Sequence, residues 1–329
     1  MSEGAAKAVG LRAGGAAAGR GARDRAGFPE RVTLEALIGL KAAGESIDLG
    51  AVRVRSLASG GHLSAFKGRG VEFDESRPYQ PGDDLRTMDW RVTARTGKPH
   101  TKVFREERNR PVMVWLDLRS SMRFGTRGAF KAVRAAEAAA LIAWSAVGNG
   151  DRFGALVFSE TEHHEQRPRL GRRAALQLLQ LVSSEVFWTP NAPDAAAAGR
   201  ENADHALLRL TRVVRPGALI FLLSDFRGLG PDAERHIRQL ARHGEVFLVH
   251  VFDPVEAELP PPGRYRIKVG NRSFAIDTAD AALRAGYRAR FDARRASLAA
   301  LARVPGVHLV DCATTGDPRV ELTRRFKNR

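Results

Sequence analysis

The sequence has 329 residues, and its 53 Lys and Arg outnumber its 37 Asp and Glu, which gives a formal net charge of +16. One cysteine, Cys312, excludes an internal disulfide framework and a cysteine metal cluster, and no apolar run approaches the roughly 18 residues of a transmembrane helix. We therefore expect a cytoplasmic protein, and since 45 of the cations are Arg and 8 are Lys, the charge alone does not indicate a nucleic-acid surface.

The N-terminal part of the chain is predicted to form a tail and a small appendage. Residues 1–27 are rich in Ala, Gly and Arg and lack the apolar core of a secretory signal, so we expect a disordered basic tail. Residues 28–110 contain a helical pattern at about 31–43, an apolar alternation at 52–55 that indicates a strand, and a polar stretch of turns. This segment is the expected N-terminal, β-rich appendage.

From residue 111 onward, short apolar runs alternate with Ala- and Leu-rich helical periods. The runs are nearly continuous, which is typical of strands buried on both faces; they lie at 112–116, 153–158, 219–223, 246–252 and 307–310. This order predicts an α/β domain over 111–315 with a doubly wound, mostly parallel sheet. A hairpin insertion is expected at about 260–278, and residues 316–329 are expected to be a basic C-terminal tail.

Four predicted strands end in an aspartate: Asp117, Asp225, Asp253 and Asp311. Ligands bind at the C-terminal ends of strands in such sheets, although a single Asp there can also simply cap the next helix. For Asp117 and Asp225 together we favour a site, because carboxylate and hydroxyl oxygens in one crevice suit a hard divalent cation.

The segment Asp117-Leu118-Arg119-Ser120-Ser121 follows the first of these strands. It resembles the metal-ion-dependent adhesion site of von Willebrand factor A domains, whose pattern is Asp-x-Ser-x-Ser. In that family the Asp, both Ser, a Thr from a later loop and a second Asp hold Mg²⁺, and Ser224-Asp225-Phe226 resembles the second-Asp element. The resemblance implies Asp117, Ser121 and Asp225 as Mg²⁺ ligands.

Two positions depart from that pattern. Arg119 replaces the first Ser, and the loop expected near residues 200–204 offers Glu201 and Asn202 but no Thr. Arg119 therefore either turns away and leaves a weak Mg²⁺ site, or stands in for the metal by pairing with Asp117 or Asp225 or by receiving a partner's carboxylate. We favour the second interpretation.

A second motif lies upstream, between Gly68 and Arg95, and includes a Pro-Gly turn and an Asp89-Trp90-Arg91 triplet. It resembles a bacterial family catalogued as domain of unknown function fifty-eight, over residues 68–158 and more loosely to 225. The motif is either a partner-binding surface or an ion-pair and hydrogen-bond network that joins this subdomain to the sheet, with Trp90 packed beneath it. The residues concerned are Asp83, Asp84, Arg86, Trp90 and Arg91.

The resemblance implies a non-enzymatic adaptor that works beside a MoxR-type AAA+ ATPase. The adaptor would bind client proteins through a degenerate metal-ion-dependent adhesion site and help to assemble or mature their complex. One alternative is a nucleic-acid-binding protein that uses its tails and the basic face of its last long helix, which carries Arg284, Arg288, Arg290, Arg294 and Arg295. Nucleic acid is the less favoured partner, because the aromatic residues mostly fall in apolar periods. A metal-dependent hydrolase at Asp117 and Asp225 is a third hypothesis, for which the sequence offers no positioned general base.

Overall fold

The structure is a computed structural model that describes residues 9–13, 29–49, 71–80, 83–106, 109–188, 195–269 and 272–327. The chain divides into two compact units, a main unit of residues 1–59 and 111–329 and a small unit of residues 60–110. The strand predicted at 52–55 lies outside the described residues. The appendage expected at 28–110 therefore differs from the observed small unit, because residues 28–59 belong to the main unit.

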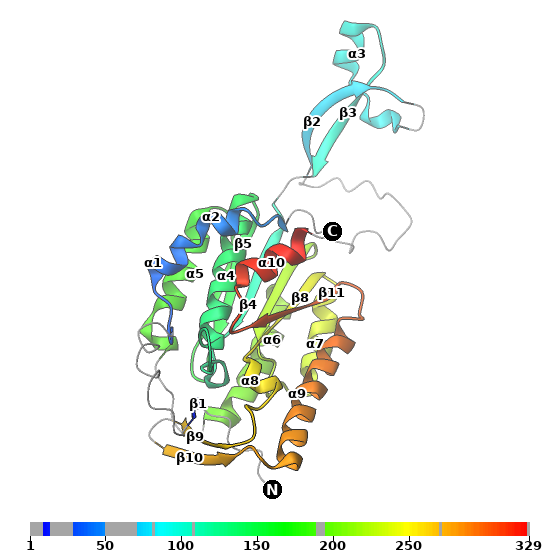
Figure 1. Ribbon diagram of the computed structural model, residues 1–329. Coiled ribbons are helices and arrows are strands. Elements are labelled where there is room, and N and C mark those ends of the chain that lie inside the picture. Colours follow the sequence, from blue (N-terminus) through cyan, green and yellow to red (C-terminus); the bar gives the residue numbers. More distant parts are fainter. Residues whose placement is uncertain are drawn as a thin grey trace. The chain divides into compact units, whose positions relative to one another are not determined.

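The main unit is built on a six-stranded sheet in the order β11-β8-β7-β4-β5-β6 (Figure 1). Its strands are β4 (Pro111–Asp117), β5 (Arg152–Phe158), β6 (His163–Arg169), β7 (Ala218–Ser224), β8 (Gly244–Phe252) and β11 (Val307–Ala313). All neighbours are parallel except β6, which pairs antiparallel with β5 at the edge. The predicted doubly wound, mostly parallel sheet is confirmed. The chain winds from β4 toward one edge and then returns to β7 on its other side, so β4 and β7 flank the switch point where such folds bind ligands.

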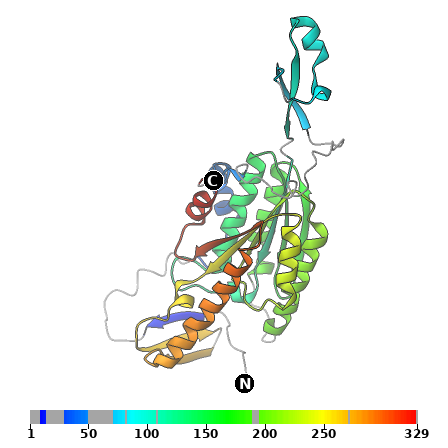
Figure 2. The ribbon, with the colours of Figure 1, turned by 90° about the vertical axis from the view of Figure 1, so that its right-hand side faces the viewer.

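Helices cover both faces of this sheet (Figures 1 and 2). In β4, Val112, Val114 and Leu116 join the core beneath α4 (Lys131–Gly148), α5 (Arg172–Ser183) and α10 (Pro318–Lys327), as strand alternation requires. Met113 and Trp115 join the core on the opposite face, which is covered by α6 (Ala195–Val213), α7 (Asp232–Ala241) and α9 (Ala281–Leu301).

Helix α4 is buried on almost every side, which explains its Ala-rich sequence. Its outer side is covered by α1 (Leu34–Gly39) and α2 (Lys41–Glu45), which together account for the helix predicted at 31–43. Trp144 of α4 donates its Nε1 hydrogen to the Leu37 carbonyl at 3.1 Å. These contacts place the first helices in the main unit rather than in the appendage.

The ends of the chain also differ from the expected tails. Residues 318–327 form α10, in which Leu322 and Phe326 are buried and Phe326 lies against Phe221 and Phe247. Within the expected N-terminal tail, β1 (Val9–Ala13) pairs antiparallel with β9 (Arg264–Val269). Strand β9 also pairs with β10 (Arg272–Asp277), which confirms the predicted hairpin. This hairpin forms a separate sheet with β1 rather than an edge of the main sheet.

The small unit consists of a β-hairpin with short helices between its strands. Strand β2 (Val71–Pro78) pairs antiparallel with β3 (His100–Glu106), and the connection contains the 3-10 turn η4 (Leu85–Thr87) and helix α3 (Trp90–Thr96). Helix α3 ends at Gly97, whose φ of 68° is the left-handed conformation that glycine adopts without strain. Across both units, no helix in the described parts of the chain has the length and apolar character needed to cross a membrane.

Candidate functional site

The C-terminal ends of β4, β7 and β8 place three buried aspartates at the same edge of the sheet, and this cluster of buried charges is called the crevice below. Asp117, Asp225 and Asp253 have no exposed surface. The fourth predicted aspartate, Asp311, lies inside β11, where it pairs with His250 and Arg295. The structure therefore gathers the two favoured aspartates, as the strand order requires, and excludes Asp311 from the crevice.

Arg119 occupies the space beside Asp117. Its Nε and Nη2 donate to the two oxygens of Asp117 at 2.9 and 2.6 Å, and its backbone N–H donates to the same carboxylate at 3.0 Å. Nη2 also donates to the Arg227 carbonyl at 3.0 Å. Burial alone would lower the pKa of the Arg119 guanidinium, but the attraction of Asp117 outweighs it and the pKa is raised. Arg119 is a permanent cation held in a bidentate pair.

Lys131 performs the same role for the second aspartate. Its Nζ lies 2.7 Å from Asp225 Oδ2 and 2.8 Å from Glu256 Oε1, with no exposed surface. Arg227 reaches the same Glu256 oxygen at 3.0 Å. Burial alone would raise the pKa of Asp225, but Lys131 and the neighbouring guanidiniums of Arg227 and Arg119 outweigh burial, so the pKa is lowered and Asp225 stays ionised.

The surrounding backbone fixes these cations in place. Lys131 is the first residue of α4, a position where the helix dipole disfavours a cation, so the carboxylates of Asp225 and Glu256 compensate for it. Glu256 lies in the short helix α8 (Pro254–Ala257) and forms a capping box with Asp253. After β7, Phe226 has a φ of 52°, an uncommon conformation for a non-glycine residue, in the turn that carries the Arg227 carbonyl toward Arg119.

Two other predicted ligand positions do not complete a metal site. Ser121 Oγ is buried and has no hydrogen-bond partner in the described part of the chain. Residues 200–204, expected as the loop that supplies a Thr, lie within α6 instead, and Asp204 there accepts a hydrogen bond from the Gly230 N–H. Thr126 donates to Asp253 rather than approaching Asp117.

These residues do not fit Mg²⁺. Both oxygens of Asp117 are held by Arg119, and Asp225 is held by Lys131, so an ion would share its space with two buried cations. Among the described residues no group of three His, Cys, Asp or Glu is arranged to hold a metal. The contacts favour the interpretation in which Arg119 replaces the metal by pairing with Asp117, and they add Lys131 as a second replacement that the sequence analysis missed.

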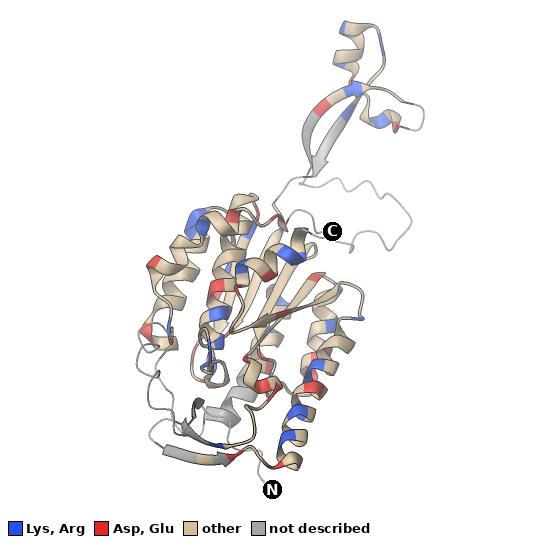
Figure 3. Cartoon of the chain, viewed as in Figure 1, with Lys and Arg blue, Asp and Glu red and all other residues tan. Residues whose placement is uncertain are grey.

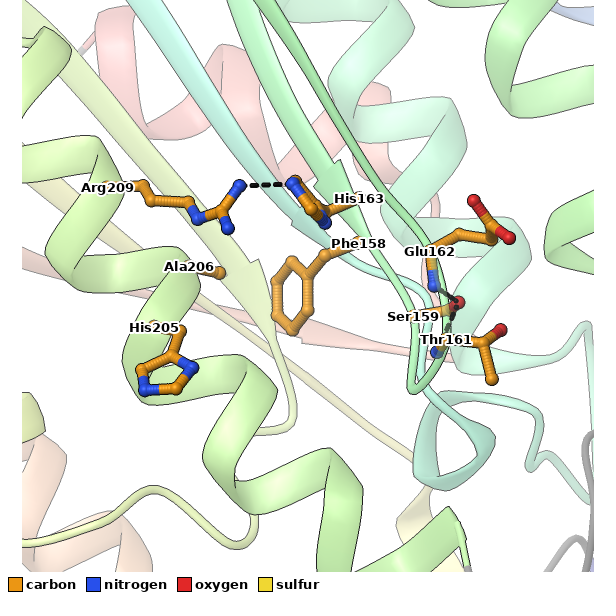
Figure 4. A pocket seen from close by; sticks show the side chains of 8 residues that line it. All are labelled: Phe158, Ser159, Thr161, Glu162, His163, His205, Ala206 and Arg209. Atoms are coloured by element: carbon orange, nitrogen blue, oxygen red, sulfur yellow. Dashed lines mark hydrogen bonds between the residues drawn. The ribbon is translucent and has the colours of Figure 1, made fainter.

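A pocket lies near the C-terminal end of β5, between the turn that leads to β6 and α6 (Figure 4). Arg209 contacts His163 across it, and the side chain of Phe158 lies between the two walls. His164 instead stacks edge-on against Phe187. Adjacent residues of the strand thus face opposite ways.

The family motif on the small unit divides into inward and outward residues. Asp83 accepts from Arg77 at 2.7 Å and from the Gln80 N–H at 2.9 Å, and the hydrogen bond from Arg77 lowers the pKa of Asp83. Asp84 accepts from the Arg86 N–H at the start of η4. These contacts assign Asp83 and Asp84 to the local fold.

The outward residues of the motif include its tryptophan. The side chain of Trp90 is 68% exposed, so Trp90 does not pack beneath the charges of its own unit, and a network that joins this unit to the sheet stays a prediction. Arg86 and Arg91 are exposed as well. These three residues remain candidates for partner binding.

The basic face predicted for the last long helix is largely occupied by internal contacts. In α9, Arg284 donates to the Pro260 carbonyl, Arg288 lies 3.6 Å from Asp292 and Arg295 lies 2.7 Å from Asp311. Arg294 is half-buried, and burial lowers the pKa of its guanidinium. Figure 3 shows the Lys and Arg residues of this helix in blue. The helix therefore lacks the continuous row of available cations that the nucleic-acid hypothesis requires.

Comparison with known proteins gives a family but no described activity. The family described as "Protein of unknown function DUF58" matches residues 75–297. An uncharacterized protein of Mycobacterium tuberculosis strain H37Rv, Rv1480, is 34% identical over 275 residues, which cover 82% of this chain and 83% of that protein. An uncharacterized protein of Mycobacterium avium is 30% identical over 163 residues, 49% of this chain and 91% of that protein. A solved structure of the conserved hypothetical protein BatB from Bacteroides thetaiotaomicron matches 67% of this chain and 100% of its own with 16% identity and a TM-score of 0.38.

Proposed function

The chain belongs to the DUF58 family of proteins of unknown function, and we propose that it is a non-enzymatic adaptor for a MoxR-type AAA+ ATPase. In this role the ATPase supplies energy and this chain binds client proteins during the assembly or maturation of their complexes. The partner class follows from the family resemblance carried by the motif at residues 68–95. The crevice supports this role by fixing the loops that follow β4 and β7.

The observation that carries the proposal is the replacement of a metal by two internal cations. Arg119 and Lys131 neutralise Asp117 and Asp225 with contacts of 2.6 to 2.9 Å. A crevice of this kind is assembled without a metal, so binding by the adaptor is independent of Mg²⁺. The same contacts support binding over hydrolysis, because a carboxylate whose oxygens are held by buried cations is poorly placed to accept a proton from a substrate.

We assign Arg119 to holding the crevice together rather than to direct client contact. Arg119 is 5% exposed, and its guanidinium faces Asp117 and the Arg227 carbonyl. A partner's carboxylate would have to displace these contacts to reach it. The crevice instead fixes the loops that follow β4 and β7, and clients bind to exposed residues elsewhere on the chain.

Co-purification with the MoxR-type ATPase of the same cell, with and without ATP, tests the proposal. We expect the unmodified chain to recover the ATPase in a nucleotide-dependent manner. Asp117→Ala should reduce recovery because it leaves Arg119 without its anion, and Arg119→Ser should reduce it because it leaves Asp117 without its cation. The surface change Asp232→Ala, at a side chain 55% exposed, is the matched control and should have no effect. The adaptor proposal is wrong if neither nucleotide nor the crevice variants change recovery.

A further inference from the structure

The small unit exposes two large apolar side chains at the start of its short helices. Leu85 in η4 is 64% exposed and Trp90 at the first position of α3 is 68% exposed. An exposed Trp is uncommon in a folded protein, and Trp is among the residues that contribute most binding energy at protein interfaces. The unit therefore offers an apolar anchor that its own described fold does not use.

The acidic residues around this anchor are used inside the unit. Asp83 pairs with Arg77, and Asp84 accepts the Arg86 N–H. Asp89 is buried, accepts from Ser76 Oγ at 2.7 Å and caps α3 through the Arg91 and Val92 N–H groups. Each of these carboxylates thus has its partners within the unit.

The basic residues around the anchor are not used in this way. The side chains of Arg86, Arg91 and Arg95 are exposed, and within the described residues they make no ion pair or side-chain hydrogen bond. Figure 3 shows Lys and Arg on η4 and α3. The exposed large apolar and basic side chains of η4 and α3, which are Leu85, Arg86, Trp90, Arg91 and Arg95, are here called the Trp90 face. They combine apolar and positively charged groups within residues 85–95.

The charge distribution of the whole chain limits which kinds of partner can bind the Trp90 face. Residues 60–110 carry 11 Lys and Arg against 8 Asp and Glu, so the rest of the chain carries +13 of the net +16. The main unit and a second copy of the chain are both cationic and are poor electrostatic partners for the Trp90 face. Nucleic acid is also disfavoured, because single-stranded binding relies on successive stacking aromatics, whereas Leu85 has no ring and Trp90 is the only aromatic residue of η4 and α3.

We infer that the Trp90 face binds an acidic segment of a protein partner that carries at least one apolar side chain. Trp90 and Leu85 bury the apolar side chain, and Arg86, Arg91 and Arg95 pair with the carboxylates. This inference rests on the proposed adaptor function and specifies the chemistry of what the adaptor binds.

Selection from a random library of 12-residue peptides, displayed against the full chain, tests this chemistry directly. We expect the enriched peptides to combine Asp or Glu with Leu, Phe or Trp. For a selected peptide, Trp90→Ala and Arg91→Glu should each weaken binding at least about tenfold in fluorescence anisotropy. Leu170→Ala and Arg215→Glu, which alter an exposed apolar residue and an exposed cation of the main unit, are the matched controls and should leave affinity unchanged.

The other outcomes overturn the inference. The inference is wrong if neutral or basic peptides are enriched. It is also wrong if Trp90→Ala and the unmodified chain bind the selected peptide equally well. A fluorescein-labelled dT20 oligonucleotide that binds only when Trp90 is present would assign the face to nucleic acid instead.

The same variants tested against the purified MoxR-type ATPase separate the two proposals. ATPase binding that survives Trp90→Ala and Arg91→Glu, combined with loss of peptide binding, assigns the face to clients and keeps the adaptor function. Failure of the unmodified chain to bind the ATPase in any nucleotide state rejects the adaptor function, while the peptide result still decides the chemistry of the face.

Discussion

Lys131 places an ammonium group between two carboxylates in a region without exposed surface, so each of these charges depends on the others. Replacing Lys131 with Met keeps the side-chain volume but leaves Asp225 and Glu256 without their shared cation. Breaking a buried pair in this way costs about 3–5 kcal/mol. We expect Lys131→Met to lower the free energy of unfolding in urea by this amount at pH 7. Lys41→Met, which breaks the surface pair with Glu45 at 3.5 Å, is the control and should cost at most about 1 kcal/mol.

The loss in Lys131→Met should depend on pH in a defined direction. In the unmodified protein the pKa of Asp225 is lowered, so its contribution to stability is present above the ordinary Asp pKa and is lost as pH falls. Without Lys131, burial opposes ionisation with less compensation, the pKa of Asp225 rises, and its contribution is lost as pH rises. The stability difference between the two proteins should therefore be larger at pH 7 than at pH 4. A difference that stays constant over this range would contradict the role given to Lys131.

The metal prediction also depends on Lys131. Arg119→Ser recreates the Asp-x-Ser-x-Ser pattern at residues 117–121, but Lys131 still holds Asp225. We expect neither the unmodified chain nor Arg119→Ser to gain thermal stability in millimolar Mg²⁺. The double variant Arg119→Ser, Lys131→Ser removes both cations and should show an Mg²⁺-dependent rise in Tm. A rise in the unmodified chain would refute the replacement of the metal.

Half of the residues of this crevice can be predicted from the sequence. The strand ends placed Asp117 and Asp225 at one edge of the sheet, and Arg119 stood out because it interrupts a known pattern. Lys131 had no such pattern. Its signal was its position at the head of an 18-residue helix that is almost entirely apolar, where an isolated cation is buried with the helix rather than solvated.

At the scale of elements, α2 packs so closely on α4 that the contact has room only for a glycine, Gly44. A Cβ added at Gly44 would lie 2.6 Å from Trp144 Cβ and 2.8 Å from the Leu141 carbonyl oxygen, whereas one added at Gly39 would meet nothing within 4 Å. Gly→Ala in a helix normally stabilises by up to about 1 kcal/mol. We expect Gly39→Ala to be neutral or stabilising and Gly44→Ala to destabilise by about 1–3 kcal/mol through overpacking. Urea unfolding measures the change in the free energy of unfolding of each variant. Equal changes in the two variants would mean that α1 and α2 do not pack on α4 as described.

The strands and helices that can be predicted from the sequence differ in their apolar pattern from those that cannot. The buried strands were predictable because their runs are continuous, as in Ala218–Ser224. Strand β6 (His163–Arg169) was not, because it is an exposed edge strand of mostly polar residues. Helix α10 was interpreted as a tail because its Arg residues dominate its composition, although Leu322 and Phe326 carry its packing. A few apolar residues are therefore enough to pack a mostly basic segment against the core.

At the scale of the whole molecule, the net charge of +16 predicts weak, non-specific attraction to polyanions and nothing more specific. The cations that suggested a nucleic-acid face on α9 are mostly engaged: Arg284 holds the Pro260 carbonyl and Arg295 holds Asp311. The charge is therefore spread over the chain rather than collected where a phosphate backbone could follow it.

Positive charge that is spread in this way should bind single-stranded DNA only weakly. Binding of fluorescein-labelled dT20 should be weak at 50 mM salt and should fall steeply by 200 mM, as expected of a purely electrostatic interaction. Neutralising Arg288 and Arg290, two exposed cations of α9, should change that affinity by no more than about twofold, because neither is expected to be a fixed phosphate contact whose loss would lower the salt slope by about one. A loss of tenfold or more would mean that α9 is a dedicated binding face, and the positive charge of the chain would then have a function of its own beside the adaptor role.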